Sequence, residues 1–139
     1  MKEPELTGRI IEAAMKVHSR LGPGLLESAY EACLAYELSK GGFSIERQKA
    51  LPVVYGEVHI DCGYRVDLLV NDAVVIELKA AETLLPIHHA QLLSYLRLSG
   101  KKLGLLINFH EVHLRDGIVR KINDPPWSSV SSVVQNDPP

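Results

Sequence analysis

Residues 64–80 read YRVDLLVNDAVVIELKA, and the rest of the chain is most easily interpreted outward from this segment. Two runs rich in β-branched and apolar residues flank a short polar turn, which predicts a pair of strands. Each run also carries a carboxylate at a position where a half-buried strand usually has an apolar or neutral side chain. These are Asp67 in the first run and Glu77 in the second, with Lys79 two places beyond. We therefore expect a β-hairpin with charged groups in its middle.

The length of the turn determines whether the two carboxylates share a face. Side chains alternate across a strand, and directly opposed residues of an antiparallel pair point the same way. A two-residue loop, 71–72, sends Asp67 and Glu77 to opposite faces of the sheet. A three-residue loop, 71–73, places Asp67 directly across from Glu77, and a bulge in either strand has the same effect.

The apolar residues favour the three-residue loop, because it collects the alternating apolar positions of both runs on one face. Those positions are Val66, Leu68, Val70, Val74, Ile76 and Leu78. Asn71 and Asp72 tolerate the left-handed conformation that such a loop usually needs. The other face then holds the carboxylates, with opposed Cβ atoms roughly 4.5–5.5 Å apart. Such a pair repels unless a positive group lies between its members.

Two interpretations of this charged face are open. In the first, Arg65 lies across from Lys79, both pair with the two acids on a solvated surface, and the hairpin has only a structural role. In the second, the carboxylates bind a hard divalent cation, Mg²⁺ or Mn²⁺, which prefers oxygen ligands. Lys79 would then position or deprotonate a water for attack on a phosphodiester. The six histidines and two cysteines show none of the spacings typical of a zinc site.

Hydrophobic periodicity along the remaining chain predicts an α/β fold with a mixed sheet. Helices are expected at 4–21, 25–40 and 86–99, each followed by glycine. Segments with period two or continuous apolar character are expected to form strands at 43–48, 51–60, 64–70, 73–80 and 102–109. The first four should form a meander of three or four strands, and 102–109 should be covered on both faces. Residues 112–122 read as a closing hairpin that turns at Asp116 and Gly117.

Composition and charge narrow the class of protein. The chain has 139 residues, 46% of them apolar and 23% charged, as expected for one globular domain. We expect that domain at 1–123, followed by a loose Pro- and Ser-rich tail at 124–139. Residues 1–123 hold 15 acidic and 15 basic residues, and this neutrality argues against a strong non-specific grip on nucleic acid. A partner or a homodimer would then supply affinity.

The N-terminal segment and the hydropathy of the chain indicate its environment. MKEPELTGRI lacks the apolar core and cleavage site of a signal peptide. No run approaches the roughly 18 apolar residues that a membrane span needs. We expect a cytoplasmic protein with no membrane contact.

Several separate motifs resemble one known family. GPGLLESAY at 22–30 is similar to the signature of the GxxExxY proteins, and RVDLLV, VVIELKA, HHAQLLSYL and LGLLINF are similar to its remaining blocks in order. The resemblance covers residues 6–122. These proteins are placed in the PD-(D/E)XK nuclease superfamily, so the resemblance implies a restriction-endonuclease-like core, in which helices flank a central mixed β-sheet.

The resemblance also implies roles for the charged residues. Asp67 matches the metal-binding Asp of the superfamily, while Glu77 and Lys79 match its (D/E)-x-K element. Glu27 matches a helical Glu that completes the metal site in related nucleases. The implied metal ligands are therefore Glu27, Asp67 and Glu77. Val66 stands where the superfamily name has Pro, a frequent departure.

A second group of implied residues lies on the helix expected at 86–99. Gln91 and Tyr95, spaced as Q-x-x-x-Y, resemble a motif of RecB-like and Cas4-like members that supports the site or contacts DNA. Gln91 joins the four residues above as an expected catalytic residue. Substrate contacts are expected from Tyr30, Arg65 and Tyr95.

Two functions follow as alternatives. The first is a Mg²⁺- or Mn²⁺-dependent nuclease that hydrolyses phosphodiester bonds, with DNA favoured over RNA. The second is a catalytically silent nuclease-fold module that binds nucleic acid or a protein partner, because one fold hosts both active and inactive members.

Overall fold

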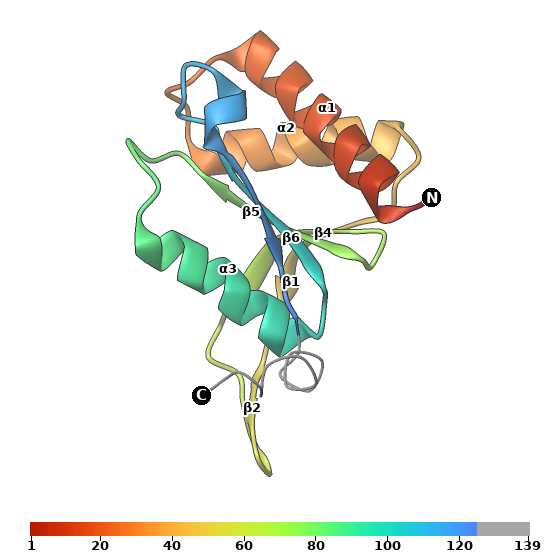
Figure 1. Cartoon of the computed structure of the whole chain (residues 1–139), viewed down its shortest axis with the longest axis vertical. Coiled ribbons are helices and arrows are strands. Elements are labelled where there is room, and N and C mark those ends of the chain that lie inside the picture. Colours follow the sequence, from red (N-terminus) through yellow and green to blue (C-terminus); the bar gives the residue numbers. More distant parts are fainter. Residues whose placement is uncertain (125–139) are drawn as a thin grey trace, which may run out of the picture.

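The computed structural model describes residues 1–124, in which helices cover both faces of a five-stranded sheet (Figure 1). The helices are α1 (Glu3–Leu21), α2 (Glu27–Lys40), α3 (Pro86–Ser99) and the short 3₁₀ helix η1 (Leu114–Gly117). The strands are β1 (Ile45–Ala50), β2 (Val53–Tyr55), β3 (Val58–Ile60), β4 (Arg65–Val70), β5 (Val74–Lys79), β6 (Leu103–Asn108) and β7 (Ile118–Ile122). The loose tail expected at 124–139 lies outside the described residues, apart from Asp124.

The sheet has the strand order β1-β4-β5-β6-β7. Strands β5 and β6 run parallel, and every other neighbouring pair is antiparallel. A parallel pair needs a long crossover connection, which α3 supplies. The expected fold class, a mixed sheet flanked by helices, is confirmed.

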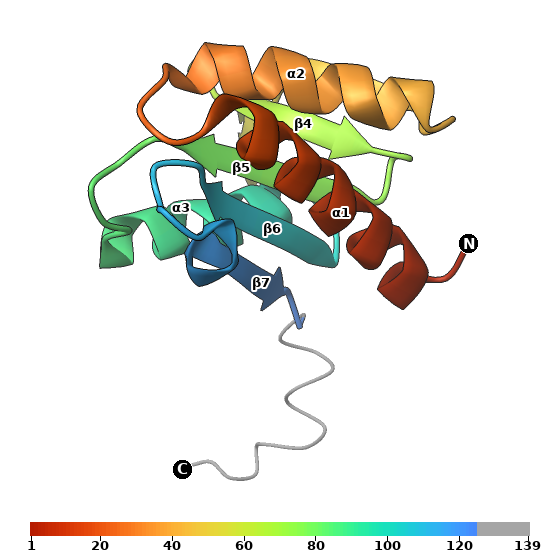
Figure 2. The same cartoon turned by 90° about the horizontal axis from the view of Figure 1, so that it is seen from above.

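The helices form a layer on each side of the sheet (Figure 2). Residues of α1 and α2 share one apolar cluster with alternate residues of β4, β5 and β6, and those of α3 share a second cluster with the opposite face. All six residues of β6 are buried. This confirms the expectation that the apolar run at 102–109 is a strand covered on both faces.

The turn between β4 and β5 has three residues, as the apolar pattern predicted. Val70 pairs with Val74 and Leu68 with Ile76. Asn71 and Asp72 both have a φ of 52°, the left-handed conformation that this loop was expected to require. The register therefore directs Asp67 and Glu77 toward each other.

One detail of the expected apolar face is wrong. Val66 packs with the cluster on the α3 side, whereas Leu68 and Val70 pack with the α1–α2 side. The physical reason is that pairing of β4 with β5 stops at Leu68, so the regular alternation of side chains is interrupted at Asp67.

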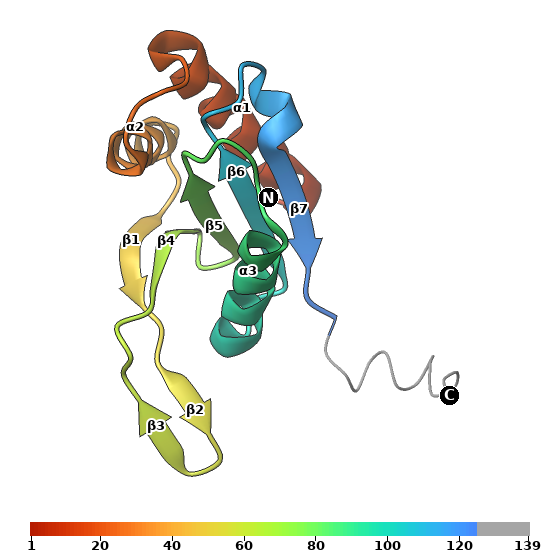
Figure 3. The same cartoon turned by 90° about the vertical axis from the view of Figure 1, so that its left-hand side faces the viewer.

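The expected meander from 43 to 80 is only partly formed. Strand β1 pairs with β4, and the chain between them leaves the sheet as a separate β2–β3 hairpin that projects from the body (Figure 3). Pro52 separates β1 from β2, and proline cannot donate to a ladder. Gly56, with a φ of 62°, provides the tight turn at the tip.

The expected closing hairpin at 112–122 is also wrong. Residues 114–117 form η1 instead of a turn, and β7 pairs with β6 from Leu103–Ile122 to Ile107–Ile118. The hairpin is thus formed by β6 and β7, with η1 in the connection. The Asp116–Gly117 dipeptide ends the 3₁₀ helix rather than joining two strands.

Candidate functional site

The two carboxylates of the β4–β5 hairpin lie where the strands separate. Beyond the last paired residues, the backbone N–H of Asp67 donates to Glu77 Oε2 at 2.9 Å. The backbone N–H of Leu78 donates to Asp67 Oδ2 at 2.8 Å. Each side chain thus takes the place of a backbone carbonyl acceptor on the opposite strand. These bonds hold both carboxylates between β4 and β5.

Burial of these acids changes their protonation. Glu77 is only 4% exposed, and its burial, together with the neighbouring Asp67, raises the pKa of Glu77 to about 8. Burial also raises the pKa of Asp67. The charge of Lys79 acts in the opposite direction on both pKa values, but burial outweighs it, so both carboxyl groups resist ionisation.

The basic residues of the hairpin do not form ion pairs with these acids. Arg65 lies 3.8 Å from Asp61, and Lys79 donates to Gln91 instead of to a carboxylate. Within residues 1–124, no Lys or Arg nitrogen comes within 4.0 Å of an Asp67 or Glu77 oxygen. The interpretation of a solvated face with paired charges is therefore wrong. The expected alignment of Arg65 with Lys79 is wrong too, since the pairing of β4 with β5 ends at Leu68 and Ile76.

Glu27 approaches the site from α2, of which it is the first residue. Its Oε2 accepts a hydrogen bond from the backbone N–H of Ala80 at 3.3 Å, directly after Lys79. In the part of the chain that the structure describes, no three His, Cys, Asp or Glu residues are grouped closely enough to hold a metal ion. Asp67 and Glu77 thus form a pair, and the side chain of Glu27 lies against the end of β5 rather than joining them.

Lys79 is held by the polar residues of α3. Its Nζ donates to Gln91 Oε1 at 3.2 Å, and Gln91 Nε2 donates to the Tyr95 hydroxyl at 3.2 Å. The Q-x-x-x-Y spacing therefore produces a continuous chain of hydrogen bonds that ends at Lys79. His88, which precedes this pair on the helix, accepts a bond from the N–H of Leu85 and caps α3.

The structure adds three residues that the sequence did not single out. Gln48 Nε2 donates both to Asp67 Oδ1 at 3.1 Å and to Glu31 Oε1 at 2.6 Å. Glu31 is buried, and its other oxygen accepts a bond from Arg47 at 3.1 Å. Gln48 has a φ of 51° in the middle of β1, a strained conformation for a residue other than glycine. These residues connect α2 and β1 to Asp67.

One signal in the sequence pointed to part of this network. Glu31 follows Glu27 by four residues and therefore lies on the same face of the helix. Gln48 had no such signal, because its side chain reaches Asp67 only through the pairing of β1 with β4, two segments far apart in the sequence.

The expectation that Tyr30 contacts substrate is wrong. Tyr30 is fully buried and stacks on Phe109, with ring centroids 4.5 Å apart. Its hydroxyl donates to the carbonyl of Gly22 at 2.6 Å and accepts from the N–H of Leu25 at 3.0 Å. Tyr30 thus fixes the α1–α2 connection and thereby positions the start of α2, where Glu27 lies.

A pocket of about 600 Å³ opens beside Lys79. One wall is a stripe of α3 that includes Gln91 and Tyr95, and Tyr64, next to Arg65, forms part of the other. Tyr64 and Tyr95 lie with ring centroids 6.1 Å apart. The pocket is therefore continuous with the hydrogen-bonded chain that holds the lysine.

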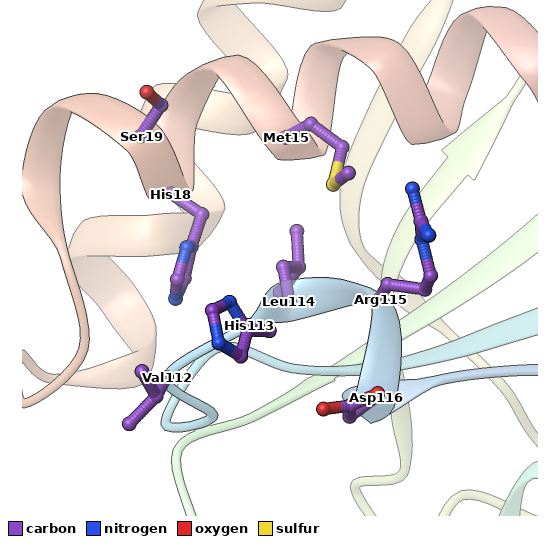
Figure 4. A pocket seen from close by; sticks show the side chains of 8 residues that line it. All are labelled: Met15, His18, Ser19, Val112, His113, Leu114, Arg115 and Asp116. Carbon is purple, nitrogen blue, oxygen red and sulfur yellow. The ribbon is translucent and has the colours of Figure 1, made fainter.

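A second pocket, also of about 600 Å³, lies between α1 and the segment around η1 (Figure 4). It contains His18, whose Nε2 lies 2.7 Å from the carbonyl of Glu111, and His113. None of the predicted site residues lines it. The chemistry expected from the sequence is thus confined to the region around β4, β5 and α3.

The donor set at Asp67 and Glu77 fits a hard divalent cation. Three of the four carboxylate oxygens accept hydrogen bonds that fix their orientation, and each oxygen retains further acceptor capacity. Among residues 1–124, Glu77 Oε1 accepts no hydrogen bond from another side chain or backbone group. Oxygen ligands of this kind suit Mg²⁺ or Mn²⁺.

No helix among residues 1–124 is both long and apolar enough to cross a membrane.

Comparisons with known proteins identify one family match. A search of curated proteins finds no match. A solved structure, the crystal structure of SSO0001, is 26% identical to the chain, with a TM-score of 0.48. The match covers 81% of this chain and 60% of that one, so the chain spans less than two thirds of its length. The family model of the PD-(D/E)XK nuclease superfamily matches residues 4–121, and the chain belongs to that superfamily.

Proposed function

We propose that this protein is a divalent-metal-dependent nuclease that hydrolyses phosphodiester bonds of DNA. Mg²⁺ or Mn²⁺ is the cation, and Asp67 and Glu77 would hold it. Glu27, at the start of α2, would reach it directly or through water. Superfamily membership supports the class of activity; the cation, the preference for DNA over RNA and the residue roles are proposals.

One observation carries the proposal. The buried carboxyl group of Glu77 and the half-buried one of Asp67 lie side by side between β4 and β5, and hydrogen bonds from opposite strands hold each of them in place. An uncompensated pair of this kind costs folding free energy, because burial and mutual repulsion both oppose ionisation. A bound cation offsets that cost, and functional sites are where such costs are retained.

The chain's own residues each have a task in the proposed reaction. Asp67 and Glu77 present oxygens at a fixed separation, and Gln48 orients Asp67. Lys79, held by Gln91, orients the attacking water and faces the scissile phosphate. A bound cation supplies Lewis-acid stabilisation of the negative charge that develops on the phosphate. The water attacks phosphorus and gives up a proton to solvent, the bond to the leaving oxygen breaks, and that oxygen takes a proton from solvent.

The experiment is a cleavage assay with plasmid and labelled oligonucleotides in Mg²⁺ or Mn²⁺. The purified full chain should cleave, EDTA should stop cleavage, and Asp67→Ala and Lys79→Ala should each reduce it to background. Tyr36→Ala, an exposed substitution on α2 that does not line the pocket beside Lys79, serves as the matched control. Undiminished cleavage by both site variants would assign the activity to a contaminant and end the proposal.

The finer assignment to the GxxExxY proteins and the RecB-like relatives is also a proposal. It rests on the separate motifs at 22–30 and 91–95. The hydrogen-bonded chain from Lys79 through Gln91 to Tyr95 supports it, because it gives the second motif a physical task.

A module that binds without cutting is the second candidate, and the projecting β2–β3 hairpin favours it. The exposed fractions of its apolar residues Val54, Tyr55, Val58 and Ile60 lie between 41% and 79%. Such an apolar surface is typical of contact with a partner or a second copy of the chain. Calorimetric titration with Mn²⁺ separates the two functions. If the wild type binds Mn²⁺ and Asp67→Ala does not, the nuclease is supported. If the wild type does not bind Mn²⁺, the binding module is supported.

A further inference from the structure

The pocket beside Lys79 has a composition that differs from the rest of the site. The acids and the lysine are polar, whereas Ile87 and Leu98 of α3 line the pocket and are 67% and 37% exposed. These residues belong to the stripe of α3 that faces away from the sheet, since Leu92 and Leu96 pack into the core. A helix that keeps apolar side chains on its outer stripe, next to a catalytic lysine, offers them to a ligand.

The opposite wall of the pocket adds aromatic surface. Tyr64 is 44% exposed and lies at a tilt of 54° to the ring of Tyr95, which is buried. Gln91 and Ser94 of α3 also line the pocket and supply polar groups between the apolar ones. Apolar walls with an aromatic ring and a few hydrogen-bonding groups are suited to a flat heteroaromatic ring.

The position of the pocket indicates which chemical group a bound heteroaromatic ring would carry. Lys79 forms one end of the pocket, and the carboxylate pair lies on the adjoining strands. A ligand that places its ring against Tyr64 and an attached phosphate at Lys79 is a nucleotide unit. The volume of about 600 Å³ falls within the range of roughly 300–1,000 Å³ that is common for small-molecule sites.

The net charge of the domain supports binding through a stacked base. Residues 1–123 are neutral overall, so release of counterions supplies little affinity for a strand. Stacking of bases on aromatic side chains is the other common source of affinity for single strands, and it is independent of sequence. A base paired within a duplex cannot enter the pocket unless it leaves the stack.

We propose that this pocket binds an unstacked nucleobase adjacent to the scissile phosphate, and that the protein therefore acts on single-stranded or locally unpaired DNA. The inference rests on the proposed nuclease function for the identity of its ligand. Tyr64 is the stacking residue, and the outer stripe of α3 forms the wall on the other side of the base.

Binding in EDTA tests the pocket without any cleavage. Fluorescence anisotropy of the full chain compares an end-labelled single strand of thymidines with a strand of equal length and charge made of abasic units. The wild-type protein should bind the thymidine strand about tenfold more tightly, since one stacked base contributes about that much. Equal affinity for the two strands, or no detectable binding of the thymidine strand, overturns the proposal.

Two variants alter the pocket in opposite ways. Tyr64→Ala removes the stacking surface, and Ser94→Trp fills the space from an exposed position of α3. Both should abolish the preference for the thymidine strand, whereas Tyr36→Ala should retain it. Circular dichroism establishes that each variant is folded. Retention of the preference in both folded pocket variants also overturns the proposal.

Failure of this inference can be told apart from failure of the proposed function. Metal- and Asp67-dependent cleavage with equal rates on single strands and duplexes overturns the inference and leaves the nuclease intact. Base-dependent binding that Tyr64→Ala abolishes, without metal-dependent cleavage, supports the pocket and removes the nuclease. Loss of dimer formation in Ser94→Trp, without any preference for bases in the wild-type protein, assigns the pocket to a protein interface and overturns the inference.

Discussion

Asp67 and Glu77 are held by each other's strands: the backbone N–H of Asp67 donates to Glu77, and the N–H that follows Glu77 donates to Asp67. This exchange interrupts the regular ladder at the point where β4 and β5 diverge. It places two carboxyl groups in a low-dielectric gap where, among residues 1–124, no ammonium or guanidinium nitrogen lies within 4.0 Å, and the more distant Lys79 only partly offsets the effect of burial. The energetic consequences can be measured.

The first prediction concerns stability against pH in the absence of metal. The pKa of Glu77 is raised from its ordinary value of 4.5 to about 8, mainly by burial. The folded protein therefore binds a proton that the unfolded chain releases, so the contribution of Glu77 to stability is greatest below pH 4.5 and falls as the pH rises to about 8. The loss is on the order of a few kcal/mol. Thermal melts in EDTA across this window should show it for the wild type.

Glu77→Gln is the matched variant for that experiment. It keeps the shape of the side chain and removes the ionisation, so its melting temperature should vary less with pH and exceed that of the wild type above pH 8. A lower melting temperature for Glu77→Gln at high pH would mean that the carboxylate is paired with a positive group, contrary to the structure.

Metal binding should be linked to proton release. A cation requires the ionised carboxylate, and Glu77 is largely protonated below its pKa of about 8. Affinity for Mn²⁺ should therefore rise about tenfold for each pH unit up to that value and then level off. Calorimetry in two buffers with different ionisation enthalpies measures the released proton. An affinity independent of pH would place the cation away from Glu77.

Gln48 should stabilise the site through its side chain, although its own backbone conformation is strained. Its φ of 51° favours glycine, so Gln48→Gly should be more stable than Gln48→Ala, by up to about 1 kcal/mol. Both variants lose the hydrogen bond to Asp67 and should bind Mn²⁺ more weakly than the wild type. Urea unfolding and metal titration measure the two effects. Wild-type metal affinity in both variants would show that Gln48 does not position Asp67.

Gln91 should act on cleavage through Lys79. Gln91→Ala removes the acceptor for the lysine Nζ and should lower kcat about 10- to 100-fold, because the ammonium loses its orientation. Mn²⁺ affinity should stay unchanged, since Gln91 donates to neither acid. Tyr95→Phe removes only the outer end of the chain and should have a smaller effect. Equal loss of metal binding in Gln91→Ala would indicate a structural role instead.

Tyr30 should contribute to stability and leave chemistry unaffected. Tyr30→Phe keeps the stacking on Phe109 and loses two hydrogen bonds of the α1–α2 connection. Unfolding free energy should fall by about 1–3 kcal/mol. Well below the melting temperature, cleavage kinetics should match those of the wild type. A rise in KM alone would show that Tyr30 contacts the substrate, contrary to its position in the structure.

The β4–β5 hairpin shows which features could be predicted from local sequence patterns. The positions of Asp67 and Glu77 on facing strands followed from the apolar alternation and from two residues that accept positive φ, all within 17 residues of chain. The helices and the buried strand at 102–109 followed from periodicity in the same way. Errors arose in the assignment of strand partners: β1 pairs with β4 while β2 and β3 form their own hairpin after Pro52, and β7 pairs with β6 while η1 occupies the expected final turn.

The sequence by itself determined the fold class, the register of β4 against β5 and the residue types that resemble a nuclease site. These are local properties, since periodicity and turn chemistry act over a few residues. Only the tertiary structure decided that the acids are buried instead of paired with Arg65 and Lys79, that Tyr30 belongs to the core, and that Gln48 and Glu31 reach the site. These outcomes depend on contacts between segments distant in the chain, because burial and side-chain partners are fixed when the helices pack on the sheet.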